Sequence, residues 1–513
     1  MKAPYRLLYN NDTTNTAGIV SPWHEEGEPF REELLVASIA EVAGAGVDAY
    51  MLSPGMGWVP WWQSQVDPGF YDWWRERTGL EVEGWGNPPN GYDRYVADGG
   101  DMVQVLVDTC RRHDMAPFVS LRMNDVHHQE HYDRKSQRSL VSCRLYAEHP
   151  EWHLDRDHPQ REGYDKRRGM NWAIPEVREY KLALLRELAS KYELAGLELD
   201  FLRDETLFRD EVPMEERVAI ITDFVSRVRQ ALDAGAQPGR HLCVRIPLAS
   251  GSHAAVGLDA ARLAAAGVDM FNLSGWYHTT QGFDITEVRR QAPDAAVYVE
   301  LTHSTGFHPH FLGHQNYGTN GDPRTSDHQY YTTAEQAHAQ GADGLSLFNF
   351  VYYRMGHQYD IPVMEPPFHV LPKLNDVAFL QRQEKYYMLA GTYYHRQLPR
   401  RLARGEQASF RMQMLAPRGS GSEGADGRLR LHLREPHADP GSLTVAVNGQ
   451  KLTPSDDVSR FHGNPFDRMI SPLANRAAYG LPINRCREGD NEITVDAGRG
   501  EMEVVYLDAS LPA

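Results

Sequence analysis

The feature that most constrains the fold is an alternation of short apolar segments and longer helical patterns over the first two thirds of the chain. Helical patterns stand at Arg31–Ala45, Val96–Arg112, Val177–Tyr192, Met214–Leu232, Leu258–Ala266 and Thr333–Gln340. The apolar segments that read as strands are Tyr5–Asp12, Val47–Ser53, Ala116–Asn124, Leu194–Phe201, His241–Pro247, Val268–Ser274, Ala295–Thr302 and Gly344–Phe350. Eight strands with intervening helices predict an α/β fold, the (β/α)₈ TIM barrel. A doubly wound sheet is the alternative, but no glycine-rich phosphate loop follows the first strand.

Three long connections follow the second, third and seventh expected strands, at Pro54–Tyr95, Asp125–Ile174 and His303–Tyr331. All three belong to the carboxyl end of a barrel, which is the end that carries catalysis in this fold. Long connections without a helical pattern are usually functional or disordered, and the many Trp, Tyr and His residues here argue against disorder. We therefore expect these loops to build a site.

The pattern changes after residue 378, and we expect residues 1–378 to form the barrel and residues 379–513 a C-terminal β-sandwich. A last helix is expected at Val377–Leu389. Strand-like segments follow at Arg428–Leu433, Leu443–Val447, Glu492–Asp496 and Glu501–Leu507, and Asn448–Gly449 is a hairpin signal. Packing against the barrel is the expected role of the sandwich, with carbohydrate binding as the alternative.

Charge and composition narrow the range of partners. The net charge is -17 and no basic stripe is present, so a nucleic-acid partner is not expected. No run of about 18 apolar residues predicts a membrane span. The four cysteines contain no C-x-x-C pair and read as reduced thiols, so we expect a cytoplasmic protein. We expect no cofactor. A homo-oligomer is compatible with the sequence, which does not specify one.

The segment Leu194–Glu205, LAGLELDFLRDE, places two acids inside an otherwise apolar strand. Side chains alternate faces along a strand, so Glu198 and Asp200 share one face and the leucines share the other. Buried acids cost several kcal/mol each unless they are paired or neutralised. The mouth of a parallel barrel, where strand ends line an active site, tolerates such acids.

The same alternation, applied to the other strands, gives a set of inward-facing side chains. A polar group gathers in the expected barrel interior: Asn10, Asp12, Ser120, Arg122, Asn124, Glu198, Asp200, Arg245, Asn272, Ser274, Trp276, Tyr298, Glu300 and Thr302. Two carboxylates that flank a sugar are the minimal apparatus of glycoside hydrolysis. The sequence therefore predicts a carbohydrate substrate.

Asp200 and Glu300 are the expected catalytic pair. Arg122 or Arg245 beside Asp200 would keep it ionised, as a nucleophile or charge stabiliser requires. Partial burial near Tyr298, Thr302 and His303 would suit Glu300 to the acid/base role. Glu198 lies deeper and reads as a structural partner of Arg245. Other acids compete for the second carboxylate: Asp12, Asp125, Asp204 and Glu205.

The segments of the third and fourth expected strands resemble those of a known group of proteins. GLELDFLRDE resembles the fourth-strand segment of glycosyl-hydrolase-like TIM-barrel proteins, where a D-G-I-x-x-D-x-x-R pattern ends the strand. Asp200 and Arg203 match its Asp and Arg, and Ser120–His128 is similar to the third-strand segment of glycosidase-like bacterial barrels. The α-amylase and melibiase groups also end strand 4 on a nucleophilic Asp, which implies that role for Asp200. No Asn-Glu pair ends strand 4, which speaks against the large clan that has its acid/base there. Arg245 stands where α-amylases carry their acid, so the resemblance does not assign the second catalytic residue.

Aromatic and histidine side chains complete the expected mouth. Most tryptophans between Trp58 and Trp85 read as a local core, with Trp58 or Trp61 facing the cleft, and Trp276 is the better stacking platform for a sugar. Histidines cluster in two loops: His127, His128, His131, His303, His308, His310 and His314. Without metal-ligand spacing, hydrogen bonding to substrate is favoured over a metal site. Two alternatives remain: a lyase or metal-dependent enzyme that uses His128 or His303 with Tyr298, and a non-catalytic sugar-binding barrel.

Overall fold

The computed structural model describes residues 4–16, 19–25, 27–55, 57–79, 82, 91–126, 143–154, 169–203, 205–235, 237–307, 322–355, 364–392, 397–417, 427–458 and 464–513. Its backbone divides into two compact units, which are described separately. One unit comprises residues 1–274 and 286–298, and the other comprises 275–285 and 299–513. The predicted domain boundary after residue 378 stays a prediction.

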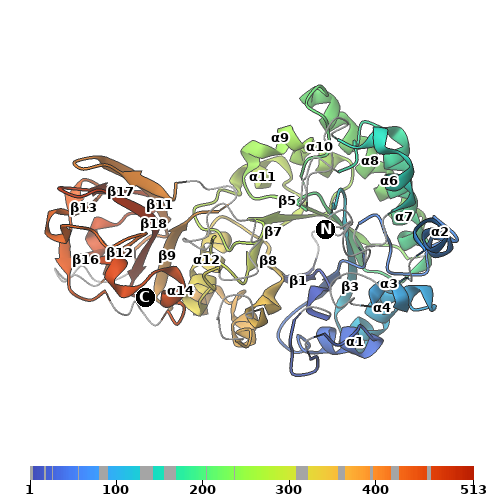
Figure 1. Ribbon diagram of the computed structural model, residues 1–513, viewed down its shortest axis with the longest axis horizontal. Helices are drawn as coiled ribbons and strands as arrows, with labels where there is room; N and C mark the ends of the chain where they lie inside the picture. Colours follow the sequence, from blue (N-terminus) through green and yellow to red (C-terminus); the bar gives the residue numbers. More distant parts are fainter. Residues whose placement is uncertain are drawn as a thin grey trace. The chain divides into compact units, whose positions relative to one another are not determined.

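A closed parallel barrel of eight strands forms the first part of the chain, in the order β1 to β8 (Figure 1). This confirms the predicted TIM barrel. The strands are β1 Leu7–Asn11, β2 Ala49–Leu52, β3 Ala116–Arg122, β4 Gly196–Asp200, β5 His241–Pro247, β6 Met270–Ser274, β7 Ala296–Thr302 and β8 Gly344–Phe348. Parallel register pairs Arg122 with Asp200 and Asp200 with Arg245, so the polar residues of β3, β4 and β5 lie at one level.

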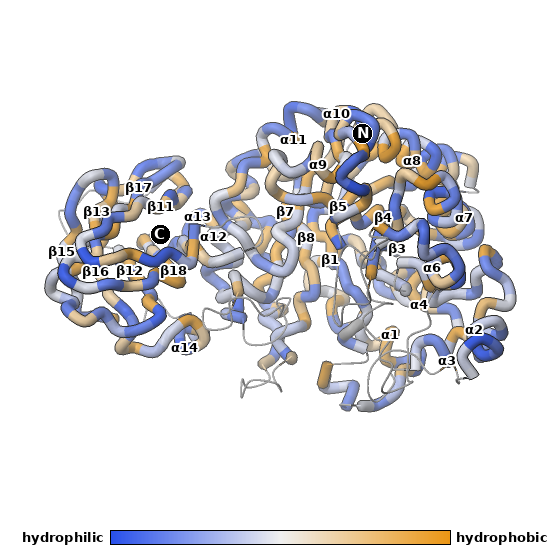
Figure 2. Tube along the Cα trace, turned by 45° about the horizontal axis from the view of Figure 1, so that its top comes forward, coloured by the Kyte–Doolittle hydropathy of each residue, from blue (hydrophilic) through white to orange (hydrophobic). Residues whose placement is uncertain are grey.

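Helices cover the strands of the first unit, and local sequence explains their ends. They are α1 Glu32–Ala40, α4 Met102–Arg112, α7 Pro175–Lys191, α8 Met214–Ala234, α9 His253–Val256, α10 Ala260–Ala265 and α11 Thr286–Gln291. Asp101 begins α4 by accepting hydrogen bonds from the backbone N–H groups of Val103 and Gln104. Pro175 begins α7, where its missing N–H costs nothing. Apolar and polar residues alternate along α7 and α8, as helices with one buried face require (Figure 2).

The connection after β2 contains two helices that the sequence did not indicate, α2 Phe70–Thr78 and α3 Tyr92–Ala97. Both begin after a glycine with positive φ, Gly69 and Gly91, and bury aromatic side chains. The connection after β3 contains α6 Arg144–Glu148. In the second unit, α12 runs over Asp327–Ala339 and begins with a capping box of Ser326 and Gln329, six residues before the predicted start.

The C-terminal strands form two antiparallel sheets, which confirms the predicted sandwich. One sheet has the order β10-β18-β12-β16-β15, with β9 also paired to β18, and the other has the order β11-β17-β13-β14. The strands are β9 Lys385–Ala390, β10 Arg400–Leu402, β11 Gln407–Met414, β12 Gly427–Leu433, β13 Thr444–Val447, β14 Gln450–Lys451, β15 Thr453–Ser455, β16 Arg476–Leu481, β17 Gly489–Asp496 and β18 Met502–Leu511. The predicted hairpin at Asn448–Gly449 joins β13 to β14, and both of its residues have positive φ.

The predicted helix Val377–Leu389 is wrong in its second half. The helix α13 ends at Gln381, and Lys385–Ala390 is strand β9, which pairs with β18 along its whole length. Tyr386 and Met388 of β9 are buried in a small apolar cluster with Ile470 and Tyr506. Pairing with β18 and burial of these side chains outweigh the local helical pattern.

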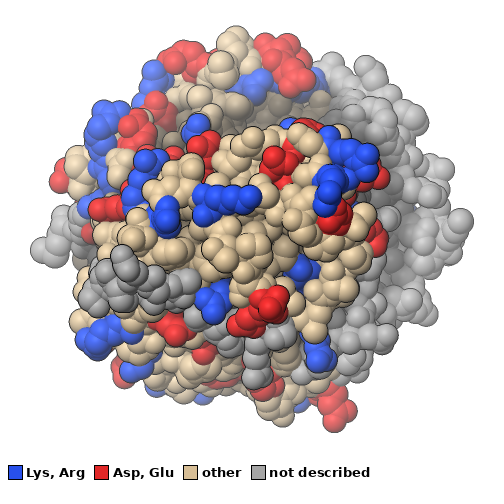
Figure 3. All heavy atoms as spheres, turned by 90° about the vertical axis from the view of Figure 1, so that its left-hand side faces the viewer, with Lys and Arg blue, Asp and Glu red and all other residues tan. Residues whose placement is uncertain are grey.

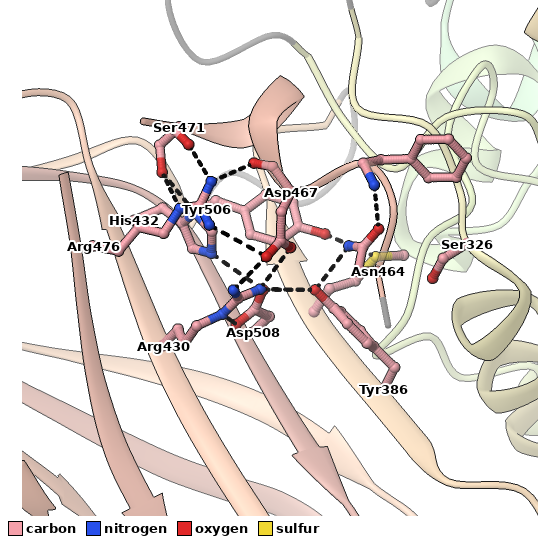
Figure 4. A network of polar contacts seen from close by, with 12 residues as sticks. Ser326, Tyr386, Arg430, His432, Asn464, Asp467, Ser471, Arg476, Tyr506 and Asp508 are labelled. Carbon is pink, nitrogen blue, oxygen red and sulfur yellow. Dashed lines mark hydrogen bonds and ion pairs between the residues drawn. The ribbon is translucent and has the colours of Figure 1, made fainter. Parts of the chain in front are cut away.

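A buried charge network lies in the first sandwich sheet (Figure 4). Arg430 on β12 binds the carboxylates of Asp467 and Asp508 in bidentate fashion, at 2.7 to 3.0 Å. Tyr386 donates to Asp508 at 2.7 Å, and His432 Nε2 lies 3.2 Å from the same carboxylate. Asp467 belongs to α14 Asp467–Ile470, so the network ties this short helix to β12 and β18.

Charges on the sandwich surface are of both signs. The face seen in Figure 3 carries basic and acidic side chains interspersed with uncharged ones. Exposed pairs such as Arg400–Glu406 and Arg499–Asp439 contribute little to stability because water screens them. Across the described part of the chain, no helix has the length and apolar character needed to cross a membrane.

Candidate active site

The interior of the barrel in the first unit is layered. Near the amino ends of the strands lies an apolar cluster of Leu8, Ala49, Met51, Phe118, Cys243, Met270, Ala296 and Tyr298. Tyr298 donates its hydroxyl hydrogen bond to the Tyr5 carbonyl oxygen at 2.8 Å. Its side chain faces inward, as alternation predicted, but it lies at the opposite end from the expected mouth. We therefore do not retain Tyr298 as a substrate-binding residue.

Glu198 forms the polar layer above this cluster, and its side chain is completely buried. Its Oε1 accepts hydrogen bonds from Asn10 at 2.6 Å and Ser120 at 2.7 Å. Its Oε2 accepts from Asn272 at 3.0 Å and from the Cys243 thiol at 3.4 Å. Four strands thus supply uncharged donors to one carboxylate. Asn10 and Asn272, both predicted to bind substrate, hold Glu198 instead.

The pKa of Glu198 is raised to about 7. Burial is the main cause and the nearby charge of Asp200 adds to it, while Arg245 and the hydrogen bonds from Ser120 and Asn272 oppose the shift. The predicted structural bridge from Glu198 to Arg245 is wrong, because the Arg245 side chain hydrogen-bonds Asp200 and Ser274. Glu198 is therefore a buried acid that changes its charge near neutral pH.

Asp200 ends β4 and is held from two sides. Arg245 Nη1 lies 3.2 Å from Oδ1 and 3.1 Å from Oδ2, and its Nη2 donates to Ser274 Oγ at 3.1 Å. The backbone N–H groups of Leu202 and Arg203 donate to Oδ1 at 3.0 and 3.2 Å. Charge-assisted hydrogen bonds of this kind are strong and fix the orientation of the carboxylate. Arg203, the arginine of the D-x-x-R pattern, thus contributes its backbone N–H to Asp200. Its side chain is buried.

Arg122, at the end of β3, bridges two further acids. Its Nη1 donates to Asp125 at 2.7 Å and its Nη2 to Asp12 at 3.1 Å, with all three side chains buried. The structure therefore brings Asp12 and Arg122 together, and it adds Asp125, which the sequence offered only as a competing acid. The two carboxylates offset part of the free-energy cost of burying the Arg122 guanidinium.

Lys181, in the middle of α7, is a residue that sequence reasoning missed. Its Nζ donates to the carbonyl oxygens of Gly57 and Arg122, and it lies 3.7 Å from the centre of the Trp58 ring. Burial lowers the pKa of Lys181 to about 7, opposed by Cys143 and Asp125. A signal was present, since Lys181 falls four residues after Val177 and four before Leu185, on the buried face of the helix.

Asn124 and Trp58 have structural roles. The Asn124 amide donates to the carbonyls of Met170 and Thr206, at 3.0 and 2.8 Å, and accepts from the Met170 N–H at 2.9 Å. It ties the connections after β3 and β4 together and has little capacity left for a substrate. Trp58 is only 1% exposed, and its ring stacks with Tyr180 and covers Lys181.

Glu300, His303 and Trp276 lie in the second unit. Glu300 is buried on β7, on the same strand face as Thr302. Thr302 donates to the Tyr277 carbonyl at 2.6 Å, and its own carbonyl accepts from Thr279 at 2.8 Å. These bonds fasten the segment that starts at Trp276, whose φ of 70 is unusual for a large side chain.

His303 packs its ring against Tyr352, with centroids 5.2 Å apart. Several expected mouth residues lie outside the described residues: His127, His128, His131, Asp204, His308, His310 and His314. Within the described residues, no group of three or more His, Cys, Asp or Glu side chains is arranged to hold a metal ion.

Known structures of similar fold include several glycoside hydrolases. An α-L-fucosidase isoenzyme from Paenibacillus thiaminolyticus is 14% identical with a TM-score of 0.41, over 76% of this chain and 51% of that one. The PgaB (BpsB) glycoside hydrolase domain from Bordetella bronchiseptica is 10% identical with a TM-score of 0.43, over 72% of this chain and 99% of that one.

A glycoside hydrolase family 20 β-N-acetylglucosaminidase is 12% identical with a TM-score of 0.40, over 72% of this chain and 69% of that one. This chain therefore spans about half of the fucosidase and more of the other two. No protein-family model and no curated protein matches the chain. At these identities and TM-scores, the likeness says nothing about substrate or mechanism.

Proposed function

We propose that the protein is a glycoside hydrolase in which Asp200 is the catalytic nucleophile or the stabiliser of positive charge on the sugar. One observation carries the proposal: an oriented carboxylate stands at the carboxyl end of β4, the end where TIM barrels place their active sites. Arg245 and the two backbone N–H groups orient this carboxylate, as attack on, or electrostatic support of, an oxocarbenium-like sugar requires.

The two Asp200 oxygens have different surroundings. Oδ1 accepts from Leu202 N, Arg203 N and Arg245, whereas among the described residues Oδ2 accepts from Arg245 alone. In a retaining reaction Oδ2 would form a bond to the anomeric carbon as the glycosidic C–O bond breaks. A general acid would give its proton to the departing oxygen, and water would later hydrolyse the glycosyl ester.

The partner acid is proposed from the sequence. Glu300 remains our candidate for the acid/base, since it follows Tyr298 on the inward face of β7 and is buried. Asp12 and Arg122 are the proposed contacts for sugar hydroxyls, because both stand at the carboxyl ends of their strands. Trp276 and His303 are retained as proposed substrate contacts.

The test combines a loss and a rescue. Fluorogenic aryl glycosides and an oligosaccharide panel identify a substrate, and Asp200→Asn should lower its turnover by about three orders of magnitude or more. In Asp200→Ala, added azide or formate should restore turnover of an aryl glycoside, because a small anion can replace the missing carboxylate. A merely structural carboxylate would not give this rescue.

Asp93→Asn is the matched control. Asp93 is a buried acid outside the proposed site, and it accepts a hydrogen bond from Trp61 at 3.2 Å. Its variant should keep turnover if it keeps its fold. Near-normal activity in Asp200→Asn would refute the assignment of Asp200. Unsaturated products would support a lyase, and sugar binding without any product would support the non-catalytic alternative.

A further inference from the structure

A hollow of about 320 Å³ lies in the connection after β2, away from Asp200 and its partners. Pockets that bind small molecules usually measure about 300–1,000 Å³. Its accessible surface is more polar than apolar. The residues that matter are the exposed Gln65 and Arg75 and the largely buried rings of Trp58, Trp62, Phe70 and Tyr180. A largely polar lining with a few aromatic rings suits a sugar ring, which carries many hydroxyl groups and small apolar patches.

These aromatic rings are held in place before any ligand arrives. Trp62 donates its indole hydrogen bond to Glu187 at 2.8 Å. Trp58 stacks on Tyr180, with ring centroids 6.2 Å apart and planes 28° apart. Lys181 Nζ lies 3.7 Å from the centre of the Trp58 ring. Side chains that are already fixed in this way lose little conformational entropy when a ligand binds beside them.

One buried donor among these rings lacks an acceptor. The indole Nε1 of Trp58 is buried and makes no hydrogen bond among the described residues, although Trp58 lines the hollow. Buried polar groups are hydrogen-bonded in the great majority of cases, and an orphan donor costs free energy. A ligand oxygen that enters the hollow can supply the acceptor.

Charges at the hollow occur in pairs of opposite sign. Asp67 lies 3.1 Å from Arg144, and Asp72 lies 3.1 Å from Arg75. A charged ligand would have to compete with these pairs, whereas a neutral polyhydroxyl ligand can share their hydrogen bonds. Gln65 and Arg75 are exposed at the rim and offer such contacts.

We propose that this hollow binds one pyranose unit of a neutral carbohydrate at a site separate from Asp200. Its Trp58 side chain connects to the barrel through Lys181, which covers the Trp58 ring and donates to the Arg122 carbonyl. A sugar chain held here would therefore be anchored beside the carboxyl ends of the strands. The binding does not depend on any hydrolysis by Asp200.

The inference is tested by titrating the full-length protein with methyl glycosides of neutral hexoses. Binding is measured by calorimetry and by saturation-transfer NMR. At least one glycoside should bind saturably. Trp58→Phe keeps an aromatic ring but removes the N–H, and it should weaken binding by roughly three- to tenfold, the value of one hydrogen bond. Arg75→Ala and Gln65→Ala, both at exposed positions, should each weaken binding several-fold.

Arg77→Ala is the matched control, since Arg77 is exposed on the same helix as Arg75 and stacks on Trp73 outside the hollow. It should bind like the wild type. Absence of binding at millimolar glycoside, or equal affinity in the wild type and all three hollow variants, would overturn the inference. If Asp200→Asn keeps its hydrolytic activity while the hollow variants lose binding, the proposed function fails and this inference stands.

Discussion

Glu198 and Asp200 lie two residues apart on one face of β4 and have opposite kinds of partner. Asp200 accepts from a guanidinium and from two backbone N–H groups. Glu198 accepts hydrogen bonds from uncharged side chains, and burial raises its pKa to about 7. Glu198, the lower acid, thus has reason to hold a proton near neutrality, while Asp200, the upper one, is oriented by a cation and two backbone donors. The two acids differ in their partners because Arg245 reaches Asp200, whereas uncharged side chains surround Glu198.

Replacing Glu198 with Gln should change how stability depends on pH. The folded pKa of about 7 exceeds the usual 4.5, so this group's contribution is fully present below pH 4.5 and is lost as pH rises to about 7. The loss amounts to at most about 1.4 kcal/mol per pH unit. Chemical denaturation at pH 5, 6 and 7 should show a smaller decline in the variant. Glu193→Gln, at an exposed acid paired with Arg111, should decline like the wild type, and an equal slope in Glu198→Gln would contradict the prediction.

Glu300→Gln tests the acid/base assignment through the leaving group. Oligosaccharides need a proton on the departing oxygen, so their turnover should fall by about 10²–10⁴-fold. A dinitrophenyl glycoside departs without that proton, so formation of its glycosyl-enzyme should fall much less. The ratio of the two losses is the measurement, and each substrate serves as a control for protein quality. Equal losses for both substrates would argue against Glu300 as the acid.

At the scale of elements, the connections after β3 and β4 meet at one amide. Asn124 holds Met170 and Thr206, and a Cβ atom on Gly169 would approach its Nδ2 to 2.6 Å. Gly169→Ala should therefore displace these hydrogen bonds and destabilise the protein by about 1–3 kcal/mol, with a loss of turnover. Urea denaturation measures the first effect. Gly251→Ala, whose Cβ meets nothing within 4 Å, should behave like the wild type. A stable, fully active Gly169→Ala would show that the loops tolerate the shift.

The sequence alone located the barrel strands closely, because each has a short apolar core and several follow an alanine-rich helix end with a glycine. His241–Pro247 was predicted to the residue. Strand β9 was not predicted, since its partner β18 is more than a hundred residues away and local pattern is blind to it. Helix α2 was missed because its aromatic residues mask the usual helical period. Elements stabilised mainly by distant partners are those that local reasoning loses.

The site shows the same division. Strand alternation correctly placed Glu198, Asp200, Arg122 and Arg245 on inward faces, because that periodicity is a property of the backbone. It could not assign partners, which depend on strand register, so Glu198 was paired with the wrong residue. Nor could it give depth along the barrel axis, so Tyr298 was placed at the mouth. Lys181 lay outside its reach because it comes from a helix.

At the scale of the whole molecule, the charge network of the sandwich responds to acid. Arg430, with His432, holds the pKa of Asp508 well below its usual range despite burial, and burial lowers the pKa of His432. A group with a lowered folded pKa stabilises above its unfolded pKa and loses that contribution as pH falls. His432 should therefore weaken the sandwich as pH falls below about 6.5, and Asp508 below about 3.8.

Hydrogen exchange read by mass spectrometry can follow this loss in β12 and β18 separately from the barrel strands. Between pH 7 and pH 5, after correction for intrinsic exchange rates, protection of β12 and β18 should fall by up to about tenfold per pH unit, as one bound proton requires. His432→Gln can still bridge polar neighbours but has no proton to gain, so its sandwich should lose less protection over the same range. The exposed His369, paired with Asp327 at 2.6 Å, provides a matched His→Gln control outside the sandwich strands. If wild type and His432→Gln lose protection equally, the acid response of the sandwich does not pass through this histidine.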